Sequence, residues 1–146
     1  MNDKFEFWHD HLGVSVPDLE AAIQWYHRVL GFEVERRIQI DTIPAKVAML
    51  KNGPLRVELF EAANGKPASE VRNIPDADIL THGNKHVSFA ADDVFALAEE
   101  FKKRGADIVW VKKLPFGGCN LFMRDVAGNL IEFVQRARPT TNVASV

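Results

Sequence analysis

The stretch HLGVSVPDLEAAIQWYHRVLG, residues 11–31, returns in altered form as HVSFAADDVFALAEEFKKRG, residues 86–105. An offset of 75 positions aligns His11 with His86 and Asp18 with Asp93, and apolar residues align with apolar residues around them. Self-similarity at a fixed offset is typical of a duplicated structural unit. The chain is therefore predicted to contain two copies of one unit.

Each copy predicts an amphipathic helix in its second part. In residues 19–30 apolar side chains recur at spacings of three and four, with Asp18 placed to cap the start and Gly31 to end the helix. Residues 94–101 show the same spacing. The aspartate that caps this second helix is at position 92 or 93.

Short strand-like runs surround both helices. Each half has one such run before its helix and three after it, so each half is predicted to fold in the order βαβββ, which gives an α+β protein. The three runs after the helix span residues 32–40, 45–51 and 55–61 in the first half and residues 106–111, 119–124 and 129–134 in the second.

One histidine occupies the same place on the first strand of each half. We place the first strand over FWHDHLGVSV, where alternation puts His9 and His11 on one face with small residues and Trp8 on the apolar face. His86 is likewise followed by small residues at the second and fourth positions after it. Because His9 aligns with Asn84, the repeat duplicates only His11, and His9 is interpreted as a polar residue near the start of the strand.

A glutamate is duplicated in the same way on the last strand of each half. One residue fewer in the second half changes the offset to 74, which aligns Glu58 with Glu132, and apolar neighbours flank both. A carboxylate in such a strand is costly to bury unless it is paired, exposed or bound to a metal. An edge strand with its glutamate in water is the structural alternative, but duplication of both His and Glu favours a functional role.

Composition limits the classes of partner. The 146 residues, of which 47% are hydrophobic and 26% charged, are typical of one globular domain, placed here over residues 1–138. A net charge of −2 indicates neither a nucleic acid nor an anionic membrane as partner. The N-terminus lacks the basic start and apolar run of a signal peptide, so we expect a cytoplasmic location. The single cysteine excludes an internal disulfide and a cysteine-based zinc site within the chain.

The region between the halves has a different composition. Residues 63–83 are rich in Pro, Gly and Asp, so they are not expected to be regular throughout. They are interpreted as a plain linker between module 1, about residues 7–62, and module 2, about residues 84–136. Residues 139–146 are expected to form a flexible tail.

The repeat resembles the vicinal oxygen chelate superfamily, which includes glyoxalase I, methylmalonyl-CoA epimerase, extradiol dioxygenases, and fosfomycin and bleomycin resistance proteins. Four segments carry the resemblance: HLGVSVPDLEAAIQWYHRVLGF, LRVELFE, KHVSFAADDV and RDVAGNLIEF. The resemblance implies that two tandem βαβββ modules form a curled mixed sheet around a metal cavity, with the helices outside.

The resemblance also implies a ligand set and a chemistry. The metal ligands would be His11, Glu58, His86 and Glu132, a nitrogen and oxygen set that suits Ni, Co, Zn, Mn or Fe without choosing among them. By the same resemblance the base that removes a substrate proton is Glu132 first and Glu58 second.

The implied activity is that of a metal-dependent lyase or isomerase of the glyoxalase I type, which moves a proton beside a chelated carbonyl of a small molecule. One alternative is ring cleavage by an extradiol-type dioxygenase, although Glu58 would occupy a position that this chemistry needs open. A second alternative is non-catalytic binding of a small toxin, as in bleomycin resistance. In this superfamily the modules of one site come from one chain or from two, and a homodimer is expected.

Substrate-contacting residues are less defined. Phe60, Phe116 and Met123 are candidate apolar walls of the cavity, and Arg56 is a candidate partner for a substrate anion. For each of them a place in the core or on the surface is the alternative.

Overall fold

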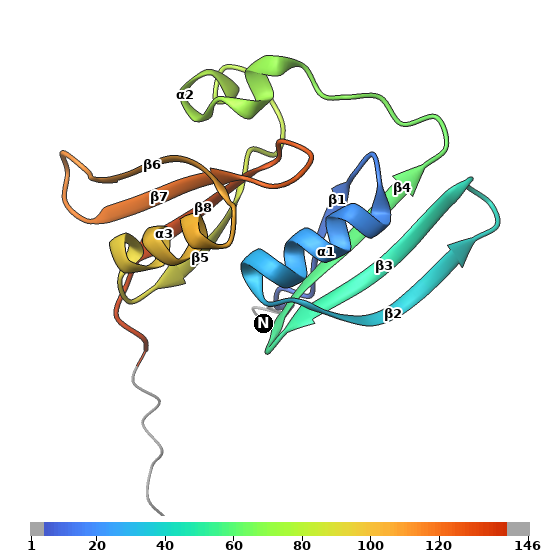
Figure 1. Cartoon of the computed structure of the whole chain (residues 1–146), viewed down its shortest axis with the longest axis horizontal. Helices are drawn as coiled ribbons and strands as arrows, with labels where there is room; N and C mark the ends of the chain where they lie inside the picture. The colour runs from blue at the N-terminus through green and yellow to red at the C-terminus, as the bar shows by residue number, and fades with distance from the viewer. Residues whose placement is uncertain (1–4, 140–146) are drawn as a thin grey trace, which may run out of the picture. The chain divides into compact units, whose positions relative to one another are not determined.

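The computed structural model describes residues 5–139, and the chain divides into two compact units, residues 1–67 and 68–146 (Figure 1). The tail predicted at residues 139–146 lies outside the described residues except for Pro139. The predicted module boundaries, 7–62 and 84–136, stay predictions.

The first unit is a four-stranded mixed sheet with one helix. The sheet has the order β1-β4-β3-β2, in which β1 runs parallel to β4 and the other pairs are antiparallel. The elements are β1 (Leu12–Ser15), α1 (Leu19–Leu30), β2 (Glu33–Ile40), β3 (Ala45–Asn52) and β4 (Leu55–Ala62).

The second unit repeats this plan after two short helical segments. Its sheet has the order β5-β8-β7-β6, again with one parallel pair, β5 with β8. Both units therefore follow the order βαβββ, which confirms the α+β class and the tandem duplication. The elements are η1 (Glu70–Asn73), α2 (Pro75–Asp78), β5 (Val87–Ala91), α3 (Val94–Lys103), β6 (Asp107–Lys113), β7 (Cys119–Arg124) and β8 (Leu130–Gln135).

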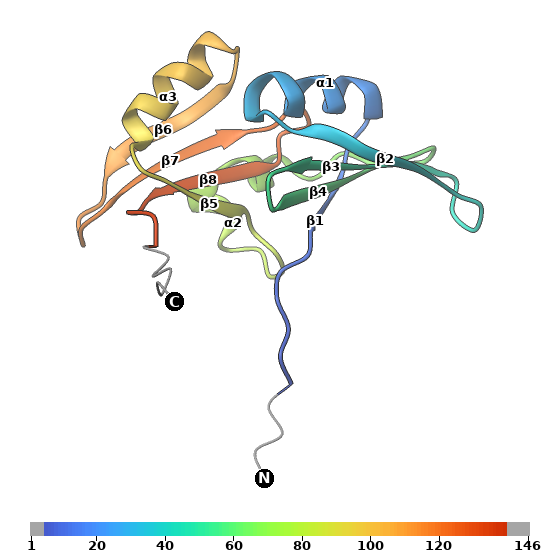
Figure 2. The same ribbon diagram turned by 90° about the horizontal axis from the view of Figure 1, so that it is seen from below.

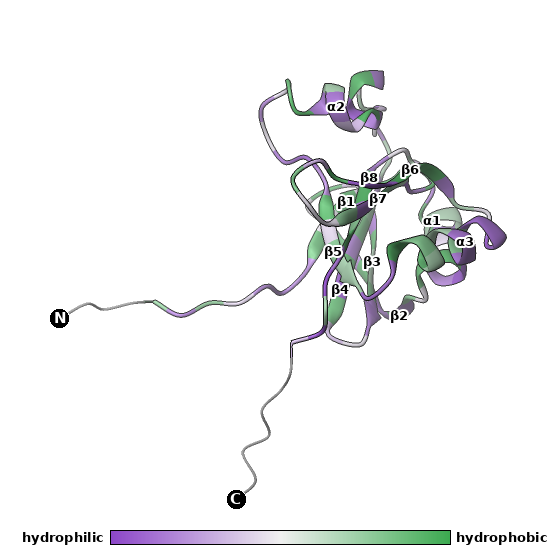
Figure 3. Ribbon diagram, turned by 90° about the vertical axis from the view of Figure 1, so that its left-hand side faces the viewer, coloured by the Kyte–Doolittle hydropathy of each residue, from purple (hydrophilic) through white to green (hydrophobic). Residues whose placement is uncertain are grey.

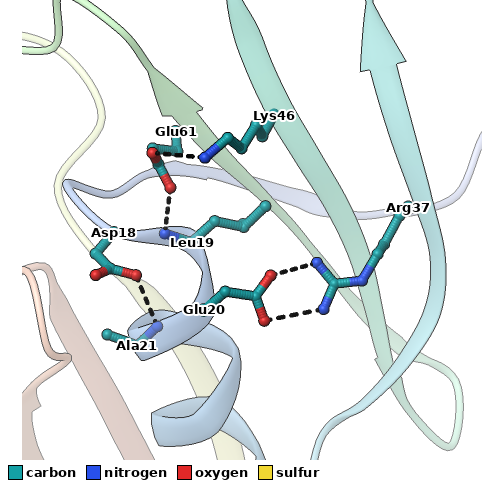
Figure 4. A network of polar contacts seen from close by, with 7 residues as sticks. All are labelled: Asp18, Leu19, Glu20, Ala21, Arg37, Lys46 and Glu61. Carbon is teal, nitrogen blue, oxygen red and sulfur yellow. Dashed lines mark hydrogen bonds and ion pairs between the residues drawn. The ribbon is translucent and has the colours of Figure 1, made fainter.

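Helix α1 begins and ends as its sequence predicts. The Asp18 carboxylate accepts a hydrogen bond from the Ala21 amide at 2.9 Å, and Glu61 on β4 accepts one from the Leu19 amide at 2.7 Å (Figure 4). These two carboxylates satisfy amides that have no partner inside the helix. Gly31 ends the helix at a φ of 71°, a left-handed conformation that favours glycine.

Helices α1 and α3 each lie on one face of the sheet of their own unit (Figure 2). Helix α3 begins after Asp93, whose side chain accepts hydrogen bonds from two backbone amides. Of the two candidate caps, Asp93 is therefore the correct one. Figure 3 shows the apolar first half of α3 in green and the charged residues of its second half in purple. The buried residues are Leu19, Ala22, Trp25, Tyr26, Val29 and Leu30 on α1, and Val94, Ala98 and Phe101 on α3.

The first strand is shorter than predicted. Strand β1 starts at Leu12, and the preceding Trp8 is 84% exposed, so its predicted place on the apolar face is wrong. The pairing register explains the difference. Leu12 pairs with Val57, and β4 begins only two residues earlier at Leu55, so residues before position 10 run past the end of the neighbouring strand.

The region predicted as a plain linker is bonded to the second unit. Asp78 at the end of α2 is 1% exposed, and its Oδ1 atom lies 2.7 Å from Nε of Arg72 and 3.1 Å from Nζ of Lys85. Arg124 on β7 donates from Nε to the carbonyl of Asn73 at 2.7 Å. These contacts connect η1 to β7, and α2 to η1 and to the residue two positions before β5. Over the described residues, every helix is too short or too polar to cross a membrane.

Candidate metal centre

His11 and Glu58 form a close pair in the first unit. The imidazole Nε2 of His11, just before β1, lies 3.0 Å from Oε2 of Glu58 on β4. The parallel pairing of β1 with β4, which sets Gly13 beside Glu58, brings the two side chains together. Their side chains are 35% and 19% exposed, so a small molecule or ion can reach them.

Asp10 orients the His11 ring. Its Oδ2 atom lies 2.7 Å from Nδ1 of His11. Because an ionised carboxylate only accepts hydrogen bonds, Nδ1 is the protonated nitrogen and Nε2 is the one presented to Glu58. The hydrogen bond with Asp10 raises the pKa of His11, and the charge of Glu58 adds to the rise against the opposing effect of desolvation. The same hydrogen bond lowers the pKa of Asp10.

His86 and Glu132 form the equivalent pair in the second unit. Nε2 of His86 lies 3.5 Å from Oε2 of Glu132 on β8. The His86 ring packs edge-to-face on Phe122 of β7, with ring centroids 4.8 Å apart. The hydroxyl of Ser88 on β5 donates to Oε1 of Glu132 at 2.9 Å. The sequence duplication of His and Glu therefore corresponds to two His–Glu pairs of similar geometry.

The glutamates are not on edge strands. Both β4 and β8 have a neighbour on each side in their sheets. Their flanking residues are buried on the opposite face, with Val57 and Ile131 only 1% and 2% exposed. The edge-strand explanation for Glu58 and Glu132 is therefore wrong, and each carboxylate lies half-buried beside an imidazole.

Each pair brings together two side chains of the kinds that bind divalent metal ions. An unprotonated Nε2 and a carboxylate oxygen about 3 Å apart are two acceptors that repel unless a proton or a cation lies between them. Imidazole nitrogen and carboxylate oxygen are ligands that borderline divalent ions accept. Among residues 5–139 no group of three or more His, Cys, Asp or Glu side chains is close enough to hold a metal, and each unit brings one His and one Glu together.

The candidate wall residues have different outcomes. Phe60 is two residues beyond Glu58 on β4 and therefore shares its face. Met123 is fully buried and pairs with Ile131, on the face opposite Glu132, so its prediction as a wall is wrong. Phe122, one residue earlier, pairs with Glu132 and takes that place. The signal that would have identified Phe122 is the strand pairing, because the residue of β7 opposite Glu132 shares the face of that glutamate.

The two remaining candidates are on the surface or already paired. Phe116 lies in the turn between β6 and β7 and is 86% exposed. Arg56 makes two hydrogen bonds to the Glu35 carboxylate, each of 3.0 Å, so its charge is already paired within the sheet.

Two βαβββ units, each with one His–Glu pair, define a class of protein. The comparison with family models gives the name of that class. Residues 8–133 match the model of the Glyoxalase/Bleomycin resistance protein/Dioxygenase superfamily. The chain belongs to this superfamily, which is the vicinal oxygen chelate family of the sequence resemblance.

Three curated relatives are similar in sequence. The uncharacterized protein YwbC of Bacillus subtilis is 27% identical over 87% of this chain and 96% of its own length. The 2-epi-5-epi-valiolone epimerase of an Actinomyces species is 31% identical over 61% of this chain, and the human mitochondrial methylmalonyl-CoA epimerase is 25% identical over 65%. The chain spans only about half the length of these two epimerases, 54% and 52%.

Solved structures show the same fold. A glyoxalase family protein from Enterococcus faecalis superposes with a TM-score of 0.75 at 19% identity, covering 88% of this chain and 97% of that one. Glyoxalase I from Zea mays superposes with a TM-score of 0.70 at 26% identity, covering 88% of this chain and 44% of that one.

Proposed function

We propose that this protein is a divalent-metal-dependent isomerase or lyase that moves a proton beside a chelated carbonyl of a small molecule. The observation that carries the proposal is the duplicated His–Glu pair, with Nε2 to Oε2 distances of 3.0 and 3.5 Å. We propose that His11, Glu58, His86 and Glu132 bind one ion of Ni, Co, Zn, Mn or Fe, and that the homodimer expected for this superfamily is the assembly that does so.

The charges and number of these ligands suit this chemistry. Two neutral imidazoles and two carboxylates balance a 2+ charge and leave two positions of an octahedron for vicinal substrate oxygens. When bound, the ion supplies Lewis acidity, which stabilises the negative charge that develops as a neighbouring C–H bond loses its proton.

The chain's own carboxylates move the proton. Glu132 is the first candidate to take it and Glu58 the second, because the resemblance to glyoxalase I implies that a ligand glutamate acts as the base. A carboxylate that takes the proton from carbon returns it to the same or a neighbouring carbon, so no electrons are gained or lost. Asp10 holds the protonated Nδ1 of His11, which would leave Nε2 available to hold the ion.

Names of relatives support this class of reaction. Two of the three curated relatives are epimerases, and the superposed Zea mays protein is a glyoxalase I. Extradiol-type ring cleavage, by contrast, uses two histidines and one carboxylate and needs three open positions on iron. A fourth protein ligand from Glu58 would close one of them.

Metal binding by histidine variants tests the ligand set. We expect about one divalent ion per site, and at least about a 100-fold loss of affinity in His11→Ala and in His86→Ala, a larger effect than loss of an outer-sphere partner. His9→Ala is the matched control, because His9 is a nearby imidazole without a counterpart in the second unit. Loss of the ion in His9→Ala with retention in His11→Ala would show that the ligand assignment is wrong.

Solvent exchange tests the reaction class. The probes are a methylglyoxal hemithioacetal, dihydroxyacetone and a methylmalonyl thioester, each with a C–H bond beside a carbonyl. We expect anaerobic, metal-dependent incorporation of deuterium from heavy water into at least one probe. Oxygen consumption on a catechol without exchange on any carbonyl probe would instead identify a dioxygenase, and binding without either reaction would identify a resistance protein.

A further inference from the structure

The glutamates of the two His–Glu pairs differ in one hydrogen bond. In the second unit Ser88 pairs with Glu132 across β5 and β8, and its hydroxyl donates to Oε1 of that carboxylate at 2.9 Å. In the first unit the residue that pairs with Glu58 in the same register is Gly13, which has no side chain to donate. The duplication therefore kept the carboxylate and varied the group beside it.

The hydrogen bond divides the two oxygens of Glu132 between two tasks. Oε1 accepts from Ser88, and Oε2 is the oxygen directed at His86, 3.5 Å from its Nε2. A carboxylate held at one oxygen keeps its plane when the other oxygen changes partner. The side chain of Glu132 is only 15% exposed, whereas its donor Ser88 is an exposed residue, so the hydrogen bond lies at the surface of the unit.

From this geometry we propose that Ser88 is a positioning residue that orients Glu132 for proton transfer. This inference rests on the proposed function and adds to it the group that makes the two glutamates unequal. Ser88 would hold Oε1 while Oε2 takes the substrate proton and returns it. Glu58, beside Gly13, has no equivalent hydroxyl and serves mainly as a ligand.

The fold itself gives no reason for this serine. Ser88 is an exposed residue of β5, and the ladder that joins β5 to β8 is formed by backbone groups. Glycine occupies the corresponding place in the first unit, where an added Cβ would have ordinary contact, 3.5 Å from Cε2 of Phe60. The hydroxyl is therefore dispensable for strand pairing.

The test is Ser88→Ala, measured by two readouts. The first is Co²⁺ affinity of the metal-free protein by calorimetry, which we expect to stay close to wild type because Oε2 and His86 are unchanged. The second is deuterium exchange into the probe that wild type turns over, which we expect to fall roughly ten- to hundredfold in kcat with little change in KM. This is the effect of losing a hydrogen bond to a charged group.

Two further variants make the result specific. Ser88→Thr keeps the hydroxyl and should recover most of the lost kcat, whereas a role in strand packing alone predicts no recovery. Ser69→Ala removes an exposed hydroxyl that makes no capping hydrogen bond before η1 of the same unit, and it serves as the matched control with wild-type exchange.

Each outcome has one meaning. Unchanged exchange in Ser88→Ala, with wild type active, overturns the role of Ser88 and leaves the proposed function standing. An equal loss of Co²⁺ affinity and exchange also overturns it, because Ser88 would then support a ligand and not a base. Absence of exchange by wild type on every probe overturns the proposed function and with it this inference.

Discussion

Replacement of Asp78 by alanine should destabilise the second unit substantially. Asp78 is 1% exposed, and Oδ1 carries both of its ion pairs, to Nε of Arg72 at 2.7 Å and to Nζ of Lys85 at 3.1 Å. Lys85 also donates to the backbone carbonyls of Asp78 and Thr81. The carboxylate is therefore the one charged group that both cations of this cluster approach.

The magnitude can be estimated from these two contacts. Lys85 donates a hydrogen bond to the carboxylate and Arg72 forms an ion pair with it, so two charged contacts of about 1.5–3 kcal/mol each give roughly 3–6 kcal/mol. Arg72 and Lys85 are 30% and 21% exposed, so water partly replaces the lost partner, and the estimate falls to about 2–4 kcal/mol. With a urea m-value of about 2 kcal/mol/M, the unfolding midpoint should fall by about 1–2 M.

Urea unfolding followed by far-ultraviolet circular dichroism measures this change. Asp76→Ala is the matched control, because Asp76 is an exposed carboxylate on the same short helix. We expect that variant to stay within about 0.5 kcal/mol of wild type. A loss below about 1 kcal/mol in Asp78→Ala, or an equal loss in both variants, would refute the conclusion that buried ion pairs anchor α2.

Three further predictions concern the site and its surroundings. Asp10→Asn should lower the raised pKa of His11, which NMR titration of the metal-free protein measures. In the wild-type protein, protons should compete with the metal for His11, so metal binding should weaken as the pH falls through that raised pKa. Glu132→Gln should retain metal and lose turnover by about two to four orders of magnitude, and Glu58→Gln should lose less; a reversed order assigns the base to Glu58. Gly128→Ala should cost about 1–3 kcal/mol in urea unfolding, because φ is +85° and the new Cβ would lie 2.9 Å from Oδ1 of Asn73; a neutral result would contradict that packing.

Most of the fold was predictable because its signals are local. Capping residues and apolar spacing located α1, and the run CNLFMR matches β7 residue for residue. The start of β1 was not predictable from its own residues, because the length of β4 limits it. The same reason explains Met123, since its face depends on its alignment with Ile131 on another strand.

The pairing of a histidine with a glutamate in each unit was predictable from the sequence, and their role as metal ligands stays a prediction. Duplication identified one histidine and one glutamate in each half, and the structure pairs them within each unit. The orientation of the side chains around these pairs could not be predicted from the sequence. That Asp10 approaches Nδ1 of His11, and that Ser88 approaches Oε1 of Glu132, depends on side-chain rotamers. The ion pairs of Asp78 were equally hidden, since a Pro- and Gly-rich composition carries no information on which charges meet.

The aromatic contacts of His86 give this protein an optical reporter. Trp110 on β6 packs edge-to-face on Phe122 at 5.2 Å between ring centroids, and Phe122 packs in turn on His86. Of the other two indoles, Trp8 is 84% exposed and Trp25 is buried in the first unit. With both replaced by phenylalanine, the remaining indole fluorescence would come from Trp110, which one aromatic ring, Phe122, separates from the imidazole. Quenching by Ni²⁺ or Co²⁺, but not by Zn²⁺ with its filled d shell, would then report metal binding at His86, as the proposed function predicts, without a substrate.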